Sequence, residues 1–564
     1  MPNKILILGG YGVFGGRLCE LLAPEKNLSF YVAGRSLAKA DAFCALLPPG
    51  AHRQALEFDR DADTVAQLLK IRVDLVIDAT GPFQSYGVDP YKVVKACLTC
   101  GVNYMDFADG AEFVKGIHAF DAEAKSKNVF VLSGVSSFPV LTAAVVRFLA
   151  RGLSQVTSIR GGIAPSPFAG VGQNVIRAIA AYAGQKIRLT RSGVQAYGYA
   201  LTETCRYTIA PPGHLPLANI RFSLVDVPDL QVLPELWPGL QHIWMGAGPV
   251  PEVLHRLLNL MAWLVRLRLV SSLTRFAPLF FQVINRLRWG EHRGGMFVEV
   301  AGELLNGRQT VRSWHLLAEG SDGPYIPCMA LQALVLQITR GQTPPHGARP
   351  ASGDLELDDY EALFAKRTIY TGQRQTIEGD APDSVFKTLL GTAWHDLPPP
   401  LQRLHDGRDI QRWSGSANVE RGTHWLAHAI ANVFGFPAST DAQLTVPIQV
   451  DITPDTSNEI WTRTFGKRSF HSTLCAGKGH YERLLTERFG PLTFALALVW
   501  TDGKLHYKVR NWQLLGVPMP NWLAPSGNTY ESAGGERFCF HIEIRLPLVG
   551  LIVKYVGWLE PVKA

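Results

Sequence analysis

Short apolar runs alternate with longer amphipathic stretches from residue 4 to about residue 150. The short runs predict buried strands, and the stretches between them predict helices. This alternation is typical of repeated βαβ units, so we predict a doubly wound parallel sheet, a Rossmann domain, over residues 1–140. The expected strands are Lys4–Leu8, Ser29–Ala33, Ala55–Phe58, Leu75–Ala79, Tyr104–Phe107 and Val129–Ser133.

The pattern becomes less regular beyond residue 140, where Gly- and Pro-rich loops separate helical from extended runs. We predict an α+β substrate or dimerisation region over 141–365, with a helix at 323–340 that can pack back on the first domain. A polar stretch over 366–383 predicts a linker. The remainder, 384–564, begins with helical segments and continues as strand-like runs with hairpin turns, which predicts a C-terminal α+β domain rich in antiparallel strands, as a curved sheet or barrel.

The first expected strand leads directly into a G-x-G-x-x-G sequence. In a dinucleotide-binding turn the first glycine permits the turn, the second lets the backbone approach a pyrophosphate, and the third lets the following helix pack on its strand. The start of that helix offers free N–H groups to the anion. We therefore predict that the cofactor contacts here are Gly9, Gly10, Gly12, Val13, Phe14 and Gly15.

The end of the second expected strand distinguishes the two nicotinamide cofactors. An acidic residue there binds the ribose hydroxyls of NAD, whereas an arginine accommodates the 2′-phosphate of NADP. Arg35 follows this strand and no acidic residue stands beside it, so we predict NADP rather than NAD. The alternative is a solvent-facing arginine at the start of the next helix.

Two further segments follow strands at the carboxyl edge, where open α/β sheets bind ligands. Asp59, after the third strand, is a candidate contact to an adenine amino group, and its alternative role is to cap the helix beginning near Ala62. After the fourth strand, we expect a short segment to line the nicotinamide end. Its residues are Thr80, Gly81, Pro82 and Phe83.

Composition limits the class of protein. Of 564 residues, 47% are hydrophobic and 18% are charged, which is typical of folded domains and excludes a disordered chain. The net charge of +7 comes from scattered residues and does not indicate nucleic-acid binding. Eight cysteines and no recognisable signal peptide lead us to expect a cytoplasmic protein.

The segment Leu254–Trp289 combines apolar clusters with several arginines. We favour two helices that face the core with their arginines in water. Peripheral contact with the inner face of a membrane stays open as the alternative. No stretch reaches the length of about 18 apolar residues that a spanning helix needs.

Several motifs together resemble the saccharopine dehydrogenase NADP-binding domain family. They are Gly9–Gly16, Ala79–Phe83, Val94–Cys97, Gly101–Asp106, Leu132–Ser137 and the later run Trp314–Pro327. The resemblance covers roughly residues 1–365 and implies a Rossmann fold and an NADP cofactor. The C-terminal region, with Trp512–Pro520 and Tyr555–Trp558, is similar to a domain of unknown function fused to bacterial members of this family.

The expected function is hydride transfer between NADP and an unidentified, apolar or acyl-type small molecule. Tyr104 and Asp106 follow the fifth strand and are candidate catalytic groups. Their alternative role is structural, with the Tyr104 hydroxyl bonded to Asp106 and the carboxylate closing the next turn. We expect no metal site, since His424 and His428 lack a third ligand. A homodimer, and a non-catalytic dinucleotide-binding protein whose C-terminal domain binds lipid or a partner at a membrane surface, stay open.

Overall fold

The computed structural model describes residues 4–83, 86–170, 172–380, 383–407, 409–437, 445–455, 458–466 and 468–562. The chain divides into two compact units, each of which is described by itself. Unit 1 comprises Met1–Arg206, Arg221–Tyr370 and Gln375–Glu378. Unit 2 comprises Tyr207–Ile220, Thr371–Arg374 and Gly379–Ala564. Unit 2 therefore contains a short excursion from the middle of the chain as well as the C-terminal region.

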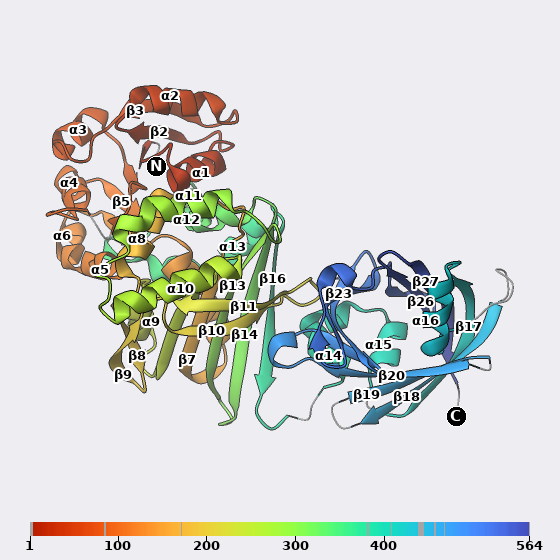
Figure 1. Ribbon diagram of the computed structural model, residues 1–564. Helices are drawn as coiled ribbons and strands as arrows, with labels where there is room; N and C mark the ends of the chain where they lie inside the picture. The colour runs from red at the N-terminus through yellow and green to blue at the C-terminus, as the bar shows by residue number, and fades with distance from the viewer. Residues whose placement is uncertain are drawn as a thin grey trace. The chain divides into compact units, whose positions relative to one another are not determined.

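A parallel sheet forms the N-terminal part of unit 1 (Figure 1). Its strand order is β3-β2-β1-β4-β5-β6-β15, and the first six strands have the order of a dinucleotide-binding fold. The predicted Rossmann fold is confirmed. The strands are β1 (Lys4–Leu8), β2 (Ser29–Gly34), β3 (His52–Glu57), β4 (Leu75–Asp78), β5 (Asn103–Asp106), β6 (Phe130–Ser133) and β15 (Gly347–Pro350). The edge strand β15 comes from a part of the chain far beyond residue 140, where we predicted the domain to end.

Helices connect these strands because parallel neighbours need crossover connections. Burial of both sheet faces explains why the strands read as apolar runs: in β4, for example, all four residues are buried. The helices are α1 (Val13–Leu22), α2 (Leu37–Leu46), α3 (Thr64–Ile71), α4 (Lys92–Cys100), α5 (Ala111–Gly116) and α6 (Asp121–Ser126).

Most of the rest of unit 1 belongs to a mixed sheet in the order β10-β11-β12-β7-β13-β14-β16, together with the separate hairpin β8–β9. Parts of β10, β11 and β16 fall within the segments assigned to unit 2. The strands are β7 (Leu153–Ala164), β8 (Lys186–Arg191), β9 (Val194–Tyr199), β10 (Thr204–Ile209), β11 (Leu217–Leu224), β12 (His242–Ala247), β13 (Arg293–Leu304), β14 (Gln309–Glu319) and β16 (Ile369–Ile377). Half of the expected linker 366–383 is thus not a loop, because β16 is the edge strand of this sheet. Residues 381–382 of that linker lie outside the described residues.

Helices accompany the mixed sheet, and one of them returns to the parallel sheet. They are α7 (Thr142–Ala150), α8 (Gln173–Tyr182), α9 (Asp229–Leu236), α10 (Glu252–Arg266), α11 (Ala277–Arg286), α12 (Ile326–Thr339) and α13 (Leu357–Phe364). The thiol of Cys328 in α12 donates to the Phe14 carbonyl of α1 at 3.4 Å, and the Gln332 amide donates to Leu21 O at 3.4 Å. The helix expected at 323–340 therefore packs on α1.

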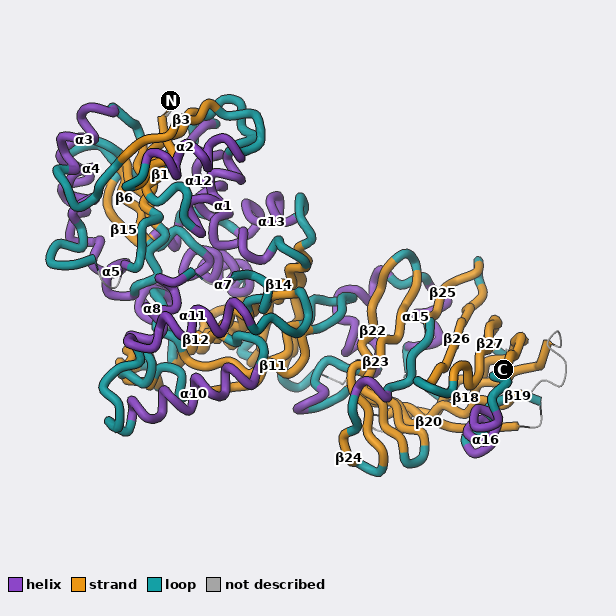
Figure 2. The backbone as a smooth tube through the Cα atoms, turned by 45° about the horizontal axis from the view of Figure 1, so that its top comes forward, coloured by secondary structure: helices purple, strands orange, loops and turns teal. Residues whose placement is uncertain are grey.

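Unit 2 is an antiparallel barrel preceded by helices, in agreement with the predicted fold class. In its described part, eleven strands follow the order β22-β21-β20-β19-β18-β17-β27-β26-β25-β23-β24, and β22 also pairs with β23. That pairing closes the sheet and leaves β24 outside the ring. Figure 2 shows these strands as one curved sheet, with α15 against it.

The strands of unit 2 are β17 (Gln411–Arg421), β18 (Thr445–Asp455), β19 (Asn458–Phe465), β20 (Arg468–Ala476), β21 (Leu485–Phe489), β22 (Leu492–Thr501), β23 (Lys504–Leu514), β24 (Val517–Pro518), β25 (Tyr530–Gly534), β26 (Arg537–Leu546) and β27 (Gly550–Pro561). Its helices are α14 (Val385–Leu390), α15 (Pro399–His405) and α16 (Trp425–Val433). A hairpin turn at Thr501–Gly503, one of the turns expected in this region, joins β22 to β23. No helix in the described parts of the chain is both long and apolar enough to span a membrane.

Candidate functional site

The glycine turn lies at the carboxyl end of β1 and leads into α1. The N–H of Gly12 donates to Gly9 O at 2.8 Å, and the N–H of Gly16 donates to Gly12 O at 2.8 Å, which fixes the turn and the first helical bond. Gly12 is the N-cap residue, its position has no side-chain cap, and the first turn carries no acidic residue. The first N–H groups of α1 are therefore available to an anion, and the helix dipole favours one there.

Two of the glycines have no room for a side chain. A Cβ on Gly15 would overlap Gly9 O, and a Cβ on Gly9 would lie 2.8 Å from Ala79 O, where Gly9 also has a φ of +72°. Gly15 therefore permits the close packing of α1 on the turn, and Gly9 permits the close approach of the segment after β4. The packing role of Gly15 is the one that the sequence predicted for the third glycine of the motif, whereas the role of Gly9 was not predicted.

The carboxyl end of β2 lies next to the same turn. Tyr11 lies against Gly34, and its hydroxyl accepts a hydrogen bond from the N–H of Ser36 at 3.2 Å. Ser36 caps α2 by accepting from the N–H of Lys39 at 3.4 Å. Arg35 stands between them with an exposed side chain. The position fits a contact to a 2′-phosphate, and sequence reasoning missed the part played by Tyr11.

Asp59 does not cap α3, contrary to the alternative considered from the sequence. The helix begins at Thr64, and Asp63 is its N-cap, accepting from the N–H of Ala66 at 3.0 Å. Asp59 instead accepts from the N–H of Asp61 at 3.0 Å and so shapes the loop after β3. Its expected contact to adenine stays a prediction.

A buried carboxylate holds the segment after β4. Asp78 accepts from the Thr80 N–H at 2.9 Å and from the Thr80 hydroxyl at 2.6 Å, and the Tyr86 hydroxyl lies 2.7 Å from that of Thr80. The guanidinium of Arg60 stacks on the Tyr86 ring at 3.4 Å. Burial raises the pKa of Asp78, and the hydrogen bonds from Thr80 oppose that shift. Thr80 thus serves the loop's shape through its side chain.

The other three predicted residues of this segment have different surroundings. Phe83 is buried, with its ring 4.6 Å from that of Tyr86 and 5.1 Å from that of Phe113. Gly81 and Pro82 are partly exposed, and Gly81 O accepts from the side-chain amide of Asn174 at 2.9 Å. The backbone at 81–82 is therefore the part of the segment that faces outward.

The region around α8 lies beside the glycine turn. Asn174 is near the start of α8, Gly172 lies against Val13, and Arg17 of α1 donates to Ala169 O at 3.1 Å. The candidate site is consequently bounded by the start of α1, the segment 79–83 and the start of α8. The ring of Phe14, at the start of α1, stacks on the ring of Phe107, with the two ring centres 5.7 Å apart.

Both candidate catalytic groups are buried within the sheet. Tyr104 is 1% exposed, and Asp106 is 0% exposed. Asp106 accepts from the N–H groups of Ala108 at 2.9 Å and Gly134 at 2.7 Å, and from the Ser133 hydroxyl at 3.1 Å. Burial raises its pKa to about 7 despite these bonds. The contacts favour the structural alternative, in which Asp106 closes the following turn, and a catalytic role stays a prediction.

A second set of acidic groups follows β5 and β11, and the sequence analysis did not find it. Burial raises the pKa of Asp226 to about 6, and the charges of Glu112 and Asp109 raise it further. The pKa of Tyr182, on α8, is raised by burial and by Asp226 and Asp109. No local motif marks these residues, because three separate segments supply them.

The described residues contain no group of three or more histidine, cysteine and acidic side chains that could hold a metal ion. His424 is the N-cap of α16, where its Nδ1 accepts from the N–H of Leu426 at 3.2 Å. That contact gives this histidine a structural role.

Comparison with protein families decides what the N-terminal region is. Residues 5–132 match the model of the saccharopine dehydrogenase NADP binding domain. They form such a domain. Residues 397–559 match a second family, the domain of unknown function DUF4166. The NADP binding domain supports a nicotinamide dinucleotide cofactor and an oxidoreductase, and neither match assigns a substrate.

The chain resembles individual proteins less closely. It is 28% identical over 155 residues to a saccharopine dehydrogenase-like oxidoreductase of Mus musculus, covering 24% of this chain and 35% of that protein. The chain thus spans about a third of this curated relative. Among solved structures, saccharopine dehydrogenase (L-Glu forming) from Saccharomyces cerevisiae has a TM-score of 0.48 and 13% identity, covering 66% of this chain and all of that one. Biliverdin reductase from Synechocystis, solved with biliverdin and NADP⁺, has a TM-score of 0.29 and 13% identity, and the match covers 61% of this chain and 93% of that one.

Proposed function

We propose that the protein is an NADP-dependent oxidoreductase of the saccharopine dehydrogenase-like type, which transfers a hydride to or from an apolar or acyl-type small molecule. The observation that carries this proposal is the tight glycine turn, which leaves the first N–H groups of α1 uncapped at the carboxyl edge of the sheet. Open α/β sheets bind their ligands at this edge.

Each boundary of the site has a distinct part in this proposal. The N–H groups at the start of α1 bind the pyrophosphate, and the exposed Arg35 binds the 2′-phosphate with its planar guanidinium. The backbone at 81–82 orients the nicotinamide, which supplies the hydride when the cofactor is bound.

The choice of cofactor is tested by replacing Arg35 with aspartate. We expect Arg35→Asp to weaken NADPH binding by about 10- to 100-fold, since charge-assisted hydrogen bonds contribute about 1.5–3 kcal/mol. NADH binding should be retained or improved. Titration with nicotinamide fluorescence measures both affinities, and Arg340→Asp, at another exposed arginine of unit 1, is the control. An unchanged preference for NADPH would remove Arg35 from the site.

The surface of α10 favours a second candidate function, a dinucleotide-binding protein that associates with a membrane. The inner face of this helix carries the buried polar residues His255 and Asn259. Its outer face carries exposed apolar side chains, namely Val253, Leu257, Leu260 and Trp263. The expectation that apolar side chains of this helix face the core holds for Ala262 and Val265, and it is wrong for Leu257, Leu260 and Trp263. An exposed apolar stripe near basic residues is typical of a helix that lies in a membrane interface.

Vesicle binding distinguishes the two candidates. We expect the double variant Leu257→Asp, Leu260→Asp to abolish sedimentation with vesicles that contain anionic lipid. The control Leu305→Asp, at an exposed leucine between β13 and β14, should leave sedimentation unchanged. NADPH binding without vesicle binding would favour the enzyme. A dimer that dissociates in the double variant would instead identify this face as an interface between two copies of the chain.

A further inference from the structure

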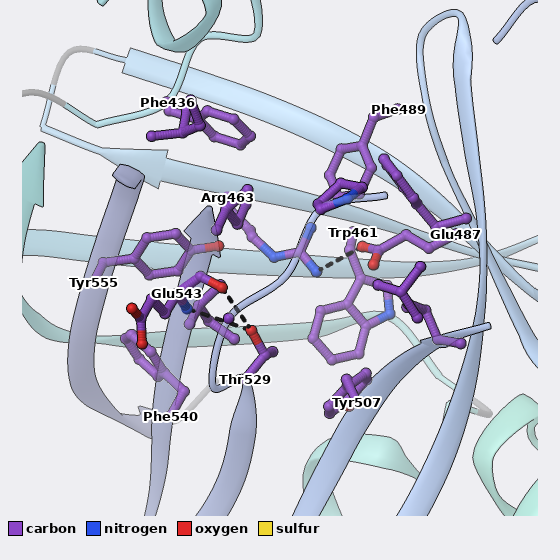
Figure 3. Close-up of a pocket in the computed structure, with 18 of the residues that line it drawn as sticks. Phe436, Trp461, Arg463, Glu487, Phe489, Tyr507, Thr529, Phe540, Glu543 and Tyr555 are labelled. Carbon is purple, nitrogen blue, oxygen red and sulfur yellow. Dashed lines mark hydrogen bonds and ion pairs between the residues drawn. The ribbon is translucent and has the colours of Figure 1, made fainter. Parts of the chain in front are cut away.

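The barrel of unit 2 encloses a cavity of about 420 Å³ (Figure 3). This volume lies within the range of about 300–1,000 Å³ that is usual for small-molecule sites. Every residue that lines it belongs to unit 2. Barrels of more than about eight strands leave room for a ligand because their interior side chains no longer meet at the axis.

Strand alternation makes the interior apolar. On β26, every second residue lines the cavity with an apolar side chain, namely Phe538, Phe540, Ile542, Ile544 and Leu546, and Glu543 is the one charged residue of this strand in the lining. On β22 they are Leu492, Phe494 and Leu496. Successive strand residues point to opposite faces, so this period of two places one apolar set inside the barrel. The result is a hydrocarbon-like space rather than a polar channel.

Polar side chains interrupt the apolar lining at several places, among them Lys508, Thr529, Glu531 and Glu543, and one cluster of them lies on three neighbouring strands. The guanidinium of Arg463, on β19, lies 2.8 Å from the Ser472 hydroxyl on β20 and 3.4 Å from Glu487 Oε1 on β21. The Ser472 hydroxyl donates to the same carboxylate oxygen at 2.7 Å. Figure 3 shows Arg463 and Glu487 together at the cavity, with the Tyr555 hydroxyl directed toward the arginine. The cluster has both donors and acceptors, and its two charges balance.

The two ends of the barrel differ. Helices α14 and α15 precede the first residue of β17 and cover that end, where the Phe386 ring stacks on the buried His405 at 3.7 Å. His405 in turn lies 2.6 Å from Glu531. This end is therefore packed with side chains that contact one another.

Apolar side chains gather at the other end. Antiparallel pairing brings the last residue of β17, the β23–β24 turn and the β26–β27 turn to this end. The segments found there expose Trp425, Val433, Leu515, Val517 and Leu548, which are between 60% and 95% exposed. Exposed apolar groups around one end of an apolar cavity are typical of the entrance used by an apolar ligand.

We propose that the barrel binds one small molecule that has a long hydrocarbon body and a single uncharged hydroxyl or carbonyl end group. The body occupies the apolar interior, and the end group exchanges hydrogen bonds with Arg463 and Glu487, which the buried Ser472 hydroxyl holds together. At this cluster an anionic end group would compete with Glu487 for Arg463, and it would lose more in desolvation than it gained from a cation that is already paired. This inference does not depend on the proposed reaction, since it concerns residues of unit 2 alone.

Binding is tested with the full chain and the neutral fluorescent probe N-phenyl-1-naphthylamine, without any nucleotide. We expect one probe per chain, displaced by 1-dodecanol at least tenfold more strongly than by dodecanoate. Ile542→Trp fills the cavity and should weaken probe binding at least tenfold. Val556→Trp, on the outer face of the neighbouring β27, should leave it unchanged. No probe binding, or equal losses in both variants, would overturn the proposal.

The choice of end group is tested by a substitution that should strengthen the binding of dodecanoate relative to dodecanol. Glu487→Gln keeps the shape of the side chain and leaves Arg463 without its counter-charge, so we expect the ratio of dodecanoate to dodecanol affinity to rise at least tenfold. The matched control is Asp451→Asn, which removes a carboxylate that pairs with Arg412 on the outside of the barrel at 2.7 Å. Circular dichroism checks that both variants fold. An unchanged ratio in folded Glu487→Gln would remove the cluster from the site.

Discussion

In the parallel sheet of unit 1, buried carboxylates hold loops in place, whereas in the barrel of unit 2 a charged pair lines an apolar cavity. Asp106 accepts three hydrogen bonds from the turns around it, and Asp78 fixes the segment that carries Thr80. Arg463 and Glu487 instead contact each other at the edge of a space large enough for a ligand. Similar chemistry thus maintains backbone shape in one unit and forms a lining in the other.

The difference shows where specificity resides in each unit. In the site proposed for unit 1, the groups that contact a dinucleotide are mainly backbone N–H groups, so their position depends on glycine geometry and helix packing. The groups offered to a ligand in unit 2 are side chains, so single substitutions can alter them without changing the fold. Substitutions in unit 1 should therefore act by displacing the backbone, and substitutions in unit 2 should act by changing the side chains that line the cavity.

The largest expected effect follows from removing a glycine in unit 1. Gly15→Val places side-chain atoms where Gly9 O lies, and α1 must move away from the turn. We expect NADPH affinity to fall at least 100-fold, while the apolar probe still binds unit 2. Gly353→Ala is the control, because a Cβ there meets no atom within 4 Å. Native-like NADPH binding in Gly15→Val would contradict the tight turn.

A second prediction compares the two interiors. Ile77 is fully buried in β4, whereas Ile542 borders the cavity. Ile77→Ala leaves a new void and should lower the free energy of unfolding of unit 1 by about 3–4 kcal/mol. Ile542→Ala enlarges an existing space and should cost unit 2 about 1–2 kcal/mol, mainly from lost apolar burial. Urea unfolding followed by pulsed hydrogen exchange and mass spectrometry reports each unit separately. Equal losses would mean that the barrel is packed as tightly as the sheet.

The same contrast explains what the sequence could predict. The glycine turn, Arg35 and the segment 80–83 lie in short stretches whose spacing carries their structural meaning. The parallel sheet followed from the repeated alternation of strands and helices, except for β15, which contributes only four residues from a distant part of the chain. Its position depends on long-range pairing, which a local pattern does not record.

The barrel cavity and the acidic set of unit 1 could not be found in this way. Arg463, Ser472 and Glu487 come together because three neighbouring strands adopt one register. Asp226 meets Asp109 and Glu112 because β11 returns near the end of β5. The exposed apolar face of α10 was also misjudged, because an amphipathic pattern gives two faces and does not state which one is buried.

A third prediction concerns pH, since unit 1 buries carboxyl groups without full compensation. Burial raises the pKa of Asp229 to about 7 from an ordinary value of 3.8. The folded state therefore keeps a proton that the unfolded state loses. Stability that is present below pH 4 is lost as the pH rises toward 7, by up to about 1.4 kcal/mol for each pH unit. Asp229→Asn should reduce this loss in unit 1 by about 2 kcal/mol between pH 5 and pH 7.

The urea experiment repeated across this pH range measures the effect, with unit 2 of the same variant as the internal control. The stability of unit 2 should show the same pH dependence in the native chain and in Asp229→Asn, because the substituted residue belongs to unit 1. A pH slope for unit 1 that is identical in both chains would show that Asp229 does not hold a proton in the folded state at neutral pH.

The smallest expected effect concerns the contact between α8 and the segment after β4. The Asn174 amide donates to Gly81 O at 2.9 Å in an exposed position, and such a hydrogen bond contributes about 0.5–1.5 kcal/mol. Asn174→Ala should therefore weaken NADPH binding only about two- to tenfold, by loosening the backbone that orients the nicotinamide. Gln173→Ala removes a neighbouring exposed amide of the same helix and should have no effect. If calorimetric titration gives the two variants equal affinities, the segment is positioned by Asp78 alone, and the site of unit 1 depends on its sheet rather than on α8.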